Sequence, residues 1–144
     1  MENLVKDLNE FLADLNVFYR KLQNYHWNIT GKSFFVMHAK LEEYYDKINE
    51  QIDEIAEHIL ILGKQPLGTM KDYLQITKIV EAKNEKIKEE EVIDSIITDY
   101  NTLLQKSIKI KEEADKQKCY GTSSMIDEYI SEYSKNLWML NQSK

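Results

Sequence analysis

Residues 38–62 read HAKLEEYYDKINEQIDEIAEHILIL, and this stretch decides the fold. Its apolar side chains recur at alternating steps of three and four, at Leu41, Tyr45, Ile48, Ile52, Ile55, Ile59 and Leu62. This spacing places them on one side of an α-helix, where they form the seam that a left-handed helical bundle buries. The stretch therefore predicts a long helix with one face in a bundle core.

Three further segments carry the same periodicity. Before residue 30 the apolar positions are Leu4, Leu8, Phe11, Leu15, Phe18, Leu22 and Tyr25. A third helix is expected from about Glu89 to Lys116, with an inner side formed by Val92, Ile93, Ile96, Ile97, Tyr100, Leu103, Leu104 and Ile108. A fourth is expected from about Thr122 to Asn141, with Met125, Ile126, Tyr129, Ile130, Tyr133, Leu137 and Leu140 inside. Four such helices predict an all-α four-helix bundle, folded as a single domain over residues 1–144.

The connections between these helices are marked by glycine, serine and proline. Gly31 is expected to end the first helix, and Ser33 is placed to cap the second. The second helix should end at residues 63–68, which read GKQPLG. The connection from Thr69 to Lys88 is too long for a tight hairpin, which indicates a crossover running the height of the bundle. A short helix is expected within it, near Met70–Ile76.

Charge and cysteine content narrow the classes of function. The net charge of −6 argues against binding nucleic acid through the whole surface, because such binding needs Lys and Arg to neutralise phosphates. The single cysteine, Cys119, excludes an internal disulfide. The chain shows no signal-peptide pattern, and no apolar run approaches the roughly 20 residues of a membrane span. A cytoplasmic protein without membrane contact is the expectation.

Two histidines and three carboxylates form a stripe of their own. On a helical wheel of about 100° per residue, Glu42, Asp53 and Glu57 fall within about 100° of His38, on one side. The apolar seam is centred near about −65° on the same wheel, so these residues are not needed to fill the core. His26, near the end of the first helix, joins them because a short loop folds the two helices back on each other.

One chain cannot close a metal site from all five residues. His38 and Asp53 are fifteen residues apart, which is about 22 Å along a helix, whereas metal–ligand bonds are about 2 Å long. Two chains lying antiparallel about a two-fold axis would bring the histidines and Glu42 of one to Asp53 and Glu57 of the other. Imidazole and carboxylate ligands together suit iron, with zinc or manganese as competitors.

These residues cannot form the alternative arrangement, a di-metal site within one chain. A di-metal site inside one four-helix bundle uses Glu-x-x-His pairs on facing helices. The positions three residues before the histidines hold Gln23, Phe35 and Ile55 instead of glutamate. The third histidine, His58, falls at about 200° on the wheel of the second helix, and we expect it at the surface.

Several motifs resemble the signature of the Dps family, the miniferritins of the ferritin-like superfamily. They are NYHWN at 24–28, FF at 34–35 followed by His38, IDEIAE at 52–57, Pro66, TMKDYL at 69–74 and LWML at 137–140. The most specific is the pair of histidines separated by eleven residues and followed by Asp-x3-Glu. The likeness runs over almost the whole chain and implies a ferritin-like bundle whose crossover carries a short helix.

The resemblance also implies an activity and an assembly. Dps proteins form hollow shells of twelve identical chains, in which hydrogen peroxide or O2 oxidises Fe(II) at two-fold interfaces and ferric mineral is stored inside. This chemistry protects the cell and its DNA from oxidative damage. Carried over by position, the catalytic metal ligands are His26, His38, Glu42, Asp53 and Glu57, with Trp27 near the site. Position 42 is commonly Asp in the family, and Glu42 keeps the negative charge on a longer side chain.

Two stretches depart from the family pattern. Residues 118–124 read KCYGTSS and hold no carboxylate, where the family often places the aspartates of a pore through which iron enters. Asp127 and Glu128 follow one turn later. Only MEN precedes the first predicted helix and QSK follows the last, so the lysine-rich tails with which some members bind DNA are missing. Direct DNA binding is therefore not expected.

Two other classes of function stay open at this point. The chain could form a DNA-binding or structural helical assembly without ferroxidase activity, in which the three carboxylates are solvated helix charges. Rapid Fe(II) oxidation without a DNA mobility shift would exclude that class. The bundle could instead hold a structural zinc ion. Metal analysis with an anaerobic Fe(II) titration separates the two metals, because zinc has no redox step.

Overall fold

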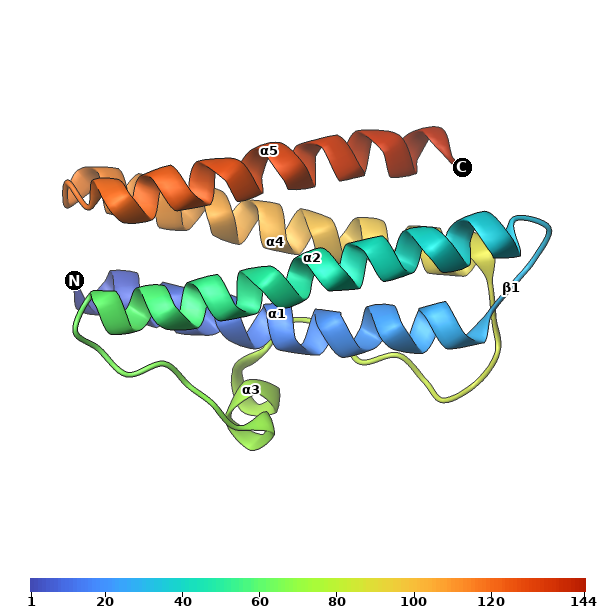
Figure 1. The fold of residues 1–144 in the computed structure, drawn as a ribbon, viewed down its shortest axis with the longest axis horizontal. Coiled ribbons are helices and arrows are strands. Elements are labelled where there is room, and N and C mark those ends of the chain that lie inside the picture. The colour runs from blue at the N-terminus through green and yellow to red at the C-terminus, as the bar shows by residue number, and fades with distance from the viewer.

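The computed structural model describes all residues from 1 to 144 and confirms the predicted all-α bundle. Its long helices are α1 (Glu2–Asn28), α2 (Phe34–Ile61), α4 (Glu89–Lys116) and α5 (Tyr120–Gln142). As Figure 1 shows, α1 lies along α2 and α4 lies along α5, and the two hairpins pack together through α1 and α4. The predicted bounds of α4 are confirmed, and α5 begins two residues earlier than expected. None of the helices is both long and apolar enough to cross a membrane.

The connection between α2 and α4 is the predicted crossover. It carries the short helix α3 (Met70–Ile76) and runs along the outside of α1 from one end of the bundle to the other (Figure 1). The carboxylate of Asp14, buried on α1, fixes its path. Asp14 Oδ1 accepts hydrogen bonds from Thr77 Oγ1 at 2.7 Å and from the backbone N–H of Lys78 at 2.8 Å. Asp14, a buried hydrogen-bond acceptor on α1, thus holds the crossover against the bundle.

A two-residue parallel ladder joins the α1–α2 turn to the start of α4, and the sequence did not predict it. β1 (Ile29–Thr30) pairs with β2 (Ile87–Lys88), with Ile29 opposite Ile87 and Thr30 opposite Lys88. Thr30 Oγ1 also donates a hydrogen bond to the Ile87 carbonyl at 3.1 Å. Two residues are too few for the alternation that identifies a strand, which is why the pattern carried no signal.

The core follows the predicted seams in α1 but drifts from them in α2 and α4. All seven apolar positions predicted for α1 are buried. In α2, Tyr44 and Gln51 are buried while the predicted Tyr45 and Ile52 are only half-buried. In α4 the buried line continues beyond Leu103 through Ser107, Ile110 and Ala114 rather than through Leu104 and Ile108. A helix with 3.6 residues per turn rotates by about 20° per heptad against a strict repeat, so the buried face shifts by one position.

Candidate metal centre

His26 and His38 face each other where α1 ends and α2 begins. Their rings are stacked, with centroids 3.6 Å apart and an interplanar angle of 11°. His26 Nδ1 lies 2.6 Å from the His38 carbonyl oxygen, and His38 Nδ1 lies 2.7 Å from the His26 carbonyl oxygen. A carbonyl only accepts, so each Nδ1 carries the hydrogen that it donates. In the neutral rings both Nε2 atoms therefore keep a free lone pair, which is the tautomer that a metal requires.

Glu42 joins this pair from the next turn of α2. Its Oε1 atom lies 3.7 Å from His26 Nε2, and its side chain is 55% exposed while that of His26 is 7% exposed. The buried ring is held in place, whereas the carboxylate can move toward an ion. The structure thus brings together three of the five predicted ligands.

Two aromatic side chains that the sequence did not assign to the site fix the histidine rings. Phe34 stacks on His38 with ring centroids 5.0 Å apart, and Tyr45 meets His26 edge-on at 5.4 Å. Burial, followed by the Glu42 and Asp46 carboxylates, raises the pKa of Tyr45, so its phenol stays protonated. Tyr45 was predicted only as a seam residue. Its helical spacing to Glu42 and His38 was the one signal that could have placed it here.

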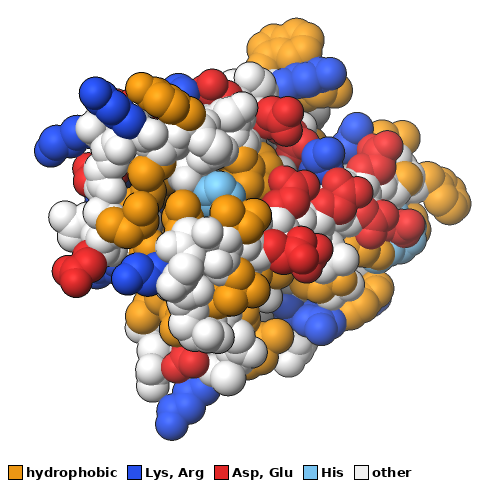
Figure 2. Space-filling view, turned by 60° about the vertical axis from the view of Figure 1, so that its left-hand side comes forward, with side chains coloured by type: hydrophobic (Ala, Val, Ile, Leu, Met, Phe, Trp, Pro, Cys, Tyr) orange, Lys and Arg blue, Asp and Glu red, His pale blue; other side chains and the backbone are white.

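Asp53 and Glu57 are exposed on α2 and are not brought to the histidines. The cluster of His26, His38 and Glu42 is not a complete metal site either, since no group of three or more His, Cys, Asp and Glu side chains in this chain is arranged to hold a metal ion. By the length argument, Asp53 and Glu57 lie too far along the helix to reach an ion at His38. Acidic side chains gather in a band on one side of the face in Figure 2.

Several exposed apolar side chains lie close in the chain to the histidine pair. Trp27 is 57% exposed, Phe35 86% and Val36 70%, and all three lie next to the α1–α2 turn in the chain. Trp27 also lines a cavity of about 600 Å³ together with Met70 and Leu74 of α3, which are exposed as well. Exposed apolar patches of this kind are typical of protein–protein contacts.

His58 is not part of this centre, and the prediction that it lies at the surface is wrong. The side chain is half-buried, and its Nε2 atom lies 2.6 Å from Thr122 Oγ1 on α5. Burial lowers the pKa of His58, which favours the neutral ring. The contact ties the end of α2 to the start of α5, so His58 has a packing role.

The corner before α5 holds no carboxylate over residues 118–124, and Asp127, one turn later, is paired with a lysine. Asp127 Oδ1 forms an ion pair with Lys111 Nζ at 3.0 Å, and Lys111 also lies 3.6 Å from Asp115 Oδ2. Ser123 connects the two, because it accepts from Lys111 and donates to Asp115. Lys111 therefore offsets the negative charge that Asp127 would add to this corner.

Comparisons with known proteins agree with this architecture. Residues 5–143 match the family described as the ferritin-like domain. The chain is 37% identical over 142 residues to DNA protection during starvation protein 2 of Bacillus anthracis, covering 96% of this chain and 94% of the relative.

Solved structures give the same result. The Dps protein of Vibrio cholerae O1, a ferritin-like diiron-carboxylate protein, superposes with a TM-score of 0.94 at 38% identity, over 98% of this chain and 88% of the other. Antigen TpF1 of Treponema pallidum superposes with a TM-score of 0.97 at 32% identity, over 99% and 91%. Sequence and fold agree, and the chain belongs to the Dps family of ferritin-like proteins.

Proposed function

We propose that this protein is a cytoplasmic ferroxidase that oxidises Fe(II), with hydrogen peroxide as the main oxidant, and stores the Fe(III) as mineral inside a hollow dodecamer. Membership in the Dps family supports iron storage and protection against oxidative stress in general terms. The finer proposal rests on the site. Protection of DNA would follow from the removal of iron and peroxide rather than from contact with DNA.

One observation carries the proposal. The two histidines have both Nδ1 atoms committed to backbone carbonyls and both Nε2 atoms free, next to Glu42. This half-site has too few ligands to hold iron alone. Asp53 and Glu57, about 22 Å and about 29 Å from His38 along the same helix, have the right chemistry to complete the half-site of a neighbouring chain. The exposed Trp27, Phe35 and Val36 supply an apolar contact surface beside it.

The roles of the side chains follow from their chemistry. Neutral imidazoles and carboxylates bind Fe(II) while leaving positions open for an oxidant, and the carboxylate charge stabilises the Fe(III) product. Two Fe(II) ions give one electron each to hydrogen peroxide, whose O–O bond breaks and which takes up two protons to leave two waters. Trp27, which follows His26 in the chain, would intercept oxidising equivalents that escape this two-electron step.

The assembly mass and the oxidation stoichiometry test this proposal together. Twelve chains of 17.1 kDa correspond to about 205 kDa, measurable by light scattering. An anaerobic titration with peroxide should consume two Fe(II) per peroxide without producing hydroxyl radicals. An intact assembly that leaves Fe(II) unoxidised would favour the structural alternative, and stoichiometric zinc that iron cannot displace would favour the zinc site.

The site should tolerate a shorter carboxylate side chain at position 42 but not the loss of the negative charge there. Glu42→Ala should weaken Fe(II) binding by at least about tenfold, the lower range for perturbing the surroundings of a metal. Glu42→Asp should keep most of the activity, because the carboxylate remains on the same turn of α2. Glu43→Ala is the matched control, since Glu43 is exposed and bonds only to Lys40, at 2.9 Å. Initial rates of Fe(II) oxidation would show the difference, and equal rates for Glu42→Ala and Glu43→Ala would remove Glu42 from the site.

A further inference from the structure

Helix α2 is capped by a residue from another helix. Ser33 occupies its N-terminal cap, but the Ser33 side chain makes no capping hydrogen bond, and the first turn holds no acidic residue. Instead, the backbone N–H of Ser33 donates to Glu89 Oε2 at 3.0 Å. The free N–H groups at a helix N-terminus carry partial positive charge, and a carboxylate is their favoured partner. Glu89, the first residue of α4, thus supplies the cap that α2 lacks.

Gly31 makes room for this carboxylate. Its backbone has φ +142°, a conformation that residues with a side chain rarely adopt. A Cβ atom at this position would lie 2.5 Å from both the carboxyl carbon and Oε2 of Glu89. Only glycine therefore allows Glu89 to reach Ser33.

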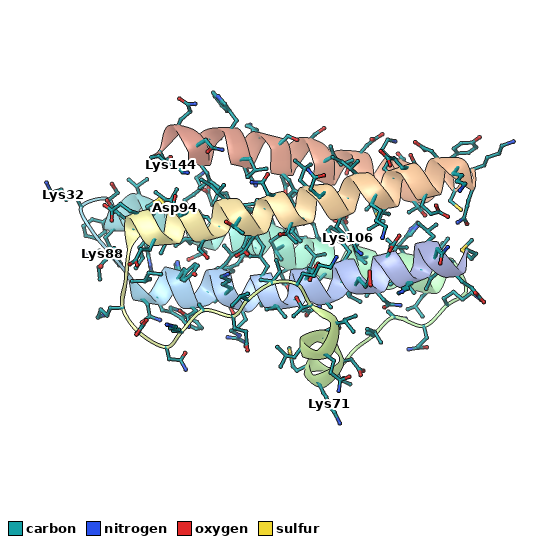
Figure 3. All side chains as sticks on the ribbon, turned by 180° about the vertical axis from the view of Figure 1, so that it is seen from behind. Lys32, Lys71, Lys88, Asp94, Lys106 and Lys144 are labelled. Atoms are coloured by element: carbon teal, nitrogen blue, oxygen red, sulfur yellow. The ribbon has the colours of Figure 1, made fainter.

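The parallel ladder brings Glu89 to the turn. Pairing of Thr30 with Lys88 places the next residue of α4 directly against the α1–α2 connection. Figure 3 shows Lys32 of the turn and Lys88 at the start of α4 at the same end of the bundle. We call this unit the Glu89 clasp: β1 paired with β2, Gly31, and Glu89 bonded to Ser33.

The clasp holds the segment that connects the two histidines. Residues 29–33 lie between His26 and His38, and each histidine bonds through Nδ1 to the backbone of the other. A displacement of the start of α2 relative to the end of α1 would break both bonds and turn both Nε2 atoms. We propose that Glu89 is a positioning residue for the metal centre, acting through the Ser33 N–H to fix the His26–His38 register. This inference rests on the proposed function.

Co(II), a redox-stable probe of such sites, tests the inference in the assembled full-length protein. We expect Glu89→Ala to weaken Co(II) binding about tenfold, within the range for residues behind metal ligands. Glu89→Gln should stay much closer to the original protein, because the amide oxygen still accepts from Ser33. Glu90→Ala removes the same charge from the same turn of α4, but Glu90 is exposed and forms no ion pair or hydrogen bond, so binding should not change. Visible absorption of bound Co(II) gives the affinities.

Hydrogen exchange of the metal-free protein separates positioning from general destabilisation. In Glu89→Ala, peptides covering residues 29–40 should exchange faster, while those covering α5 should match the Glu90→Ala control. Equal Co(II) affinity in Glu89→Ala and Glu90→Ala, with binding abolished in His38→Ala, would overturn the inference and leave the proposed function standing. Weaker binding without faster exchange would also overturn it. If His38→Ala bound Co(II) as tightly as the original protein, the proposed site itself would be wrong and the role of Glu89 would fall with it.

Discussion

Assemblies made only of His38→Ala chains, or only of Asp53→Ala chains, should oxidise Fe(II) at least about 100-fold more slowly than the original protein. Mutating residues behind the ligands of a metal costs up to about 100-fold, and a lost ligand should cost no less. The losses should be alike although the two residues are about 22 Å apart on one helix. His38→Ala removes a ligand from one half of every shared site, and Asp53→Ala removes a ligand from the other half. Stopped-flow absorbance of the Fe(III) product gives the rates.

Co-expression of the two mutant chains should restore activity. In a two-fold pair of one His38→Ala chain and one Asp53→Ala chain, one site loses both halves and the other keeps both. Half of randomly formed pairs are mixed, so about a quarter of all sites should be intact. Differently tagged chains, purified through both tags, would enrich the mixed assemblies and raise this fraction.

A matched control distinguishes shared sites from a general effect of mixing. His26 and His38 contribute to the same half-site, so each site in a mixed pair of His26→Ala and His38→Ala chains still lacks one histidine. These assemblies should show no recovery. If His38→Ala and Asp53→Ala chains recovered no more activity than this control, the shared-site geometry would be refuted.

Lys21→Met should destabilise the bundle by about 3–5 kcal/mol per chain, the cost of leaving a buried charge without its partner. Lys21 Nζ on α1 lies 2.8 Å from Asp99 Oδ2 on α4, and both side chains are 6% exposed. No hydrogen-bond donor other than this ammonium reaches Asp99 Oδ2. Urea unfolding followed by circular dichroism would measure the change.

The deficit of Lys21→Met should depend on pH. Burial raises the pKa of Asp99, and the Lys21 ammonium opposes this rise, so its removal raises that pKa further. A carboxyl group whose pKa is higher in the folded state binds more protons when folded, and stability falls as pH rises through the interval between its unfolded and folded pKa values. The difference from the original protein should therefore be largest at neutral pH and should shrink toward about pH 5.

Two variants control for the loss of a lysine. Lys40→Met breaks the exposed pair with Glu43 and should change stability by no more than about 0.5 kcal/mol. Lys21→Met combined with Asp99→Leu should recover most of the loss, because an apolar pair avoids the cost of burying a charge. A deficit that persisted unchanged in the double variant would assign the effect to packing of the lysine stem instead.

Much of the fold could be predicted from the chain alone. The bounds of α3 and α4 were confirmed, and the seven seam positions of α1 are all buried. Helical periodicity is a local signal that repeats over many residues, so it survives without knowledge of the partners. The exact buried face of α4 beyond Leu103 was missed, because the rotation of a straight helix against its neighbour is set by packing.

The sequence by itself determined the number of helices, because periodic spacing is a signal within one element. From the same spacing it predicts the types of ligand and the need for a second chain. Only the tertiary structure decided which histidine nitrogens are free, where His58 packs and that Glu89 caps α2. These depend on contacts between elements, such as the Ser33–Glu89 hydrogen bond across 56 residues of chain. No periodic pattern encodes such a contact, since it exists only once the crossover has returned α4 to the α1–α2 turn.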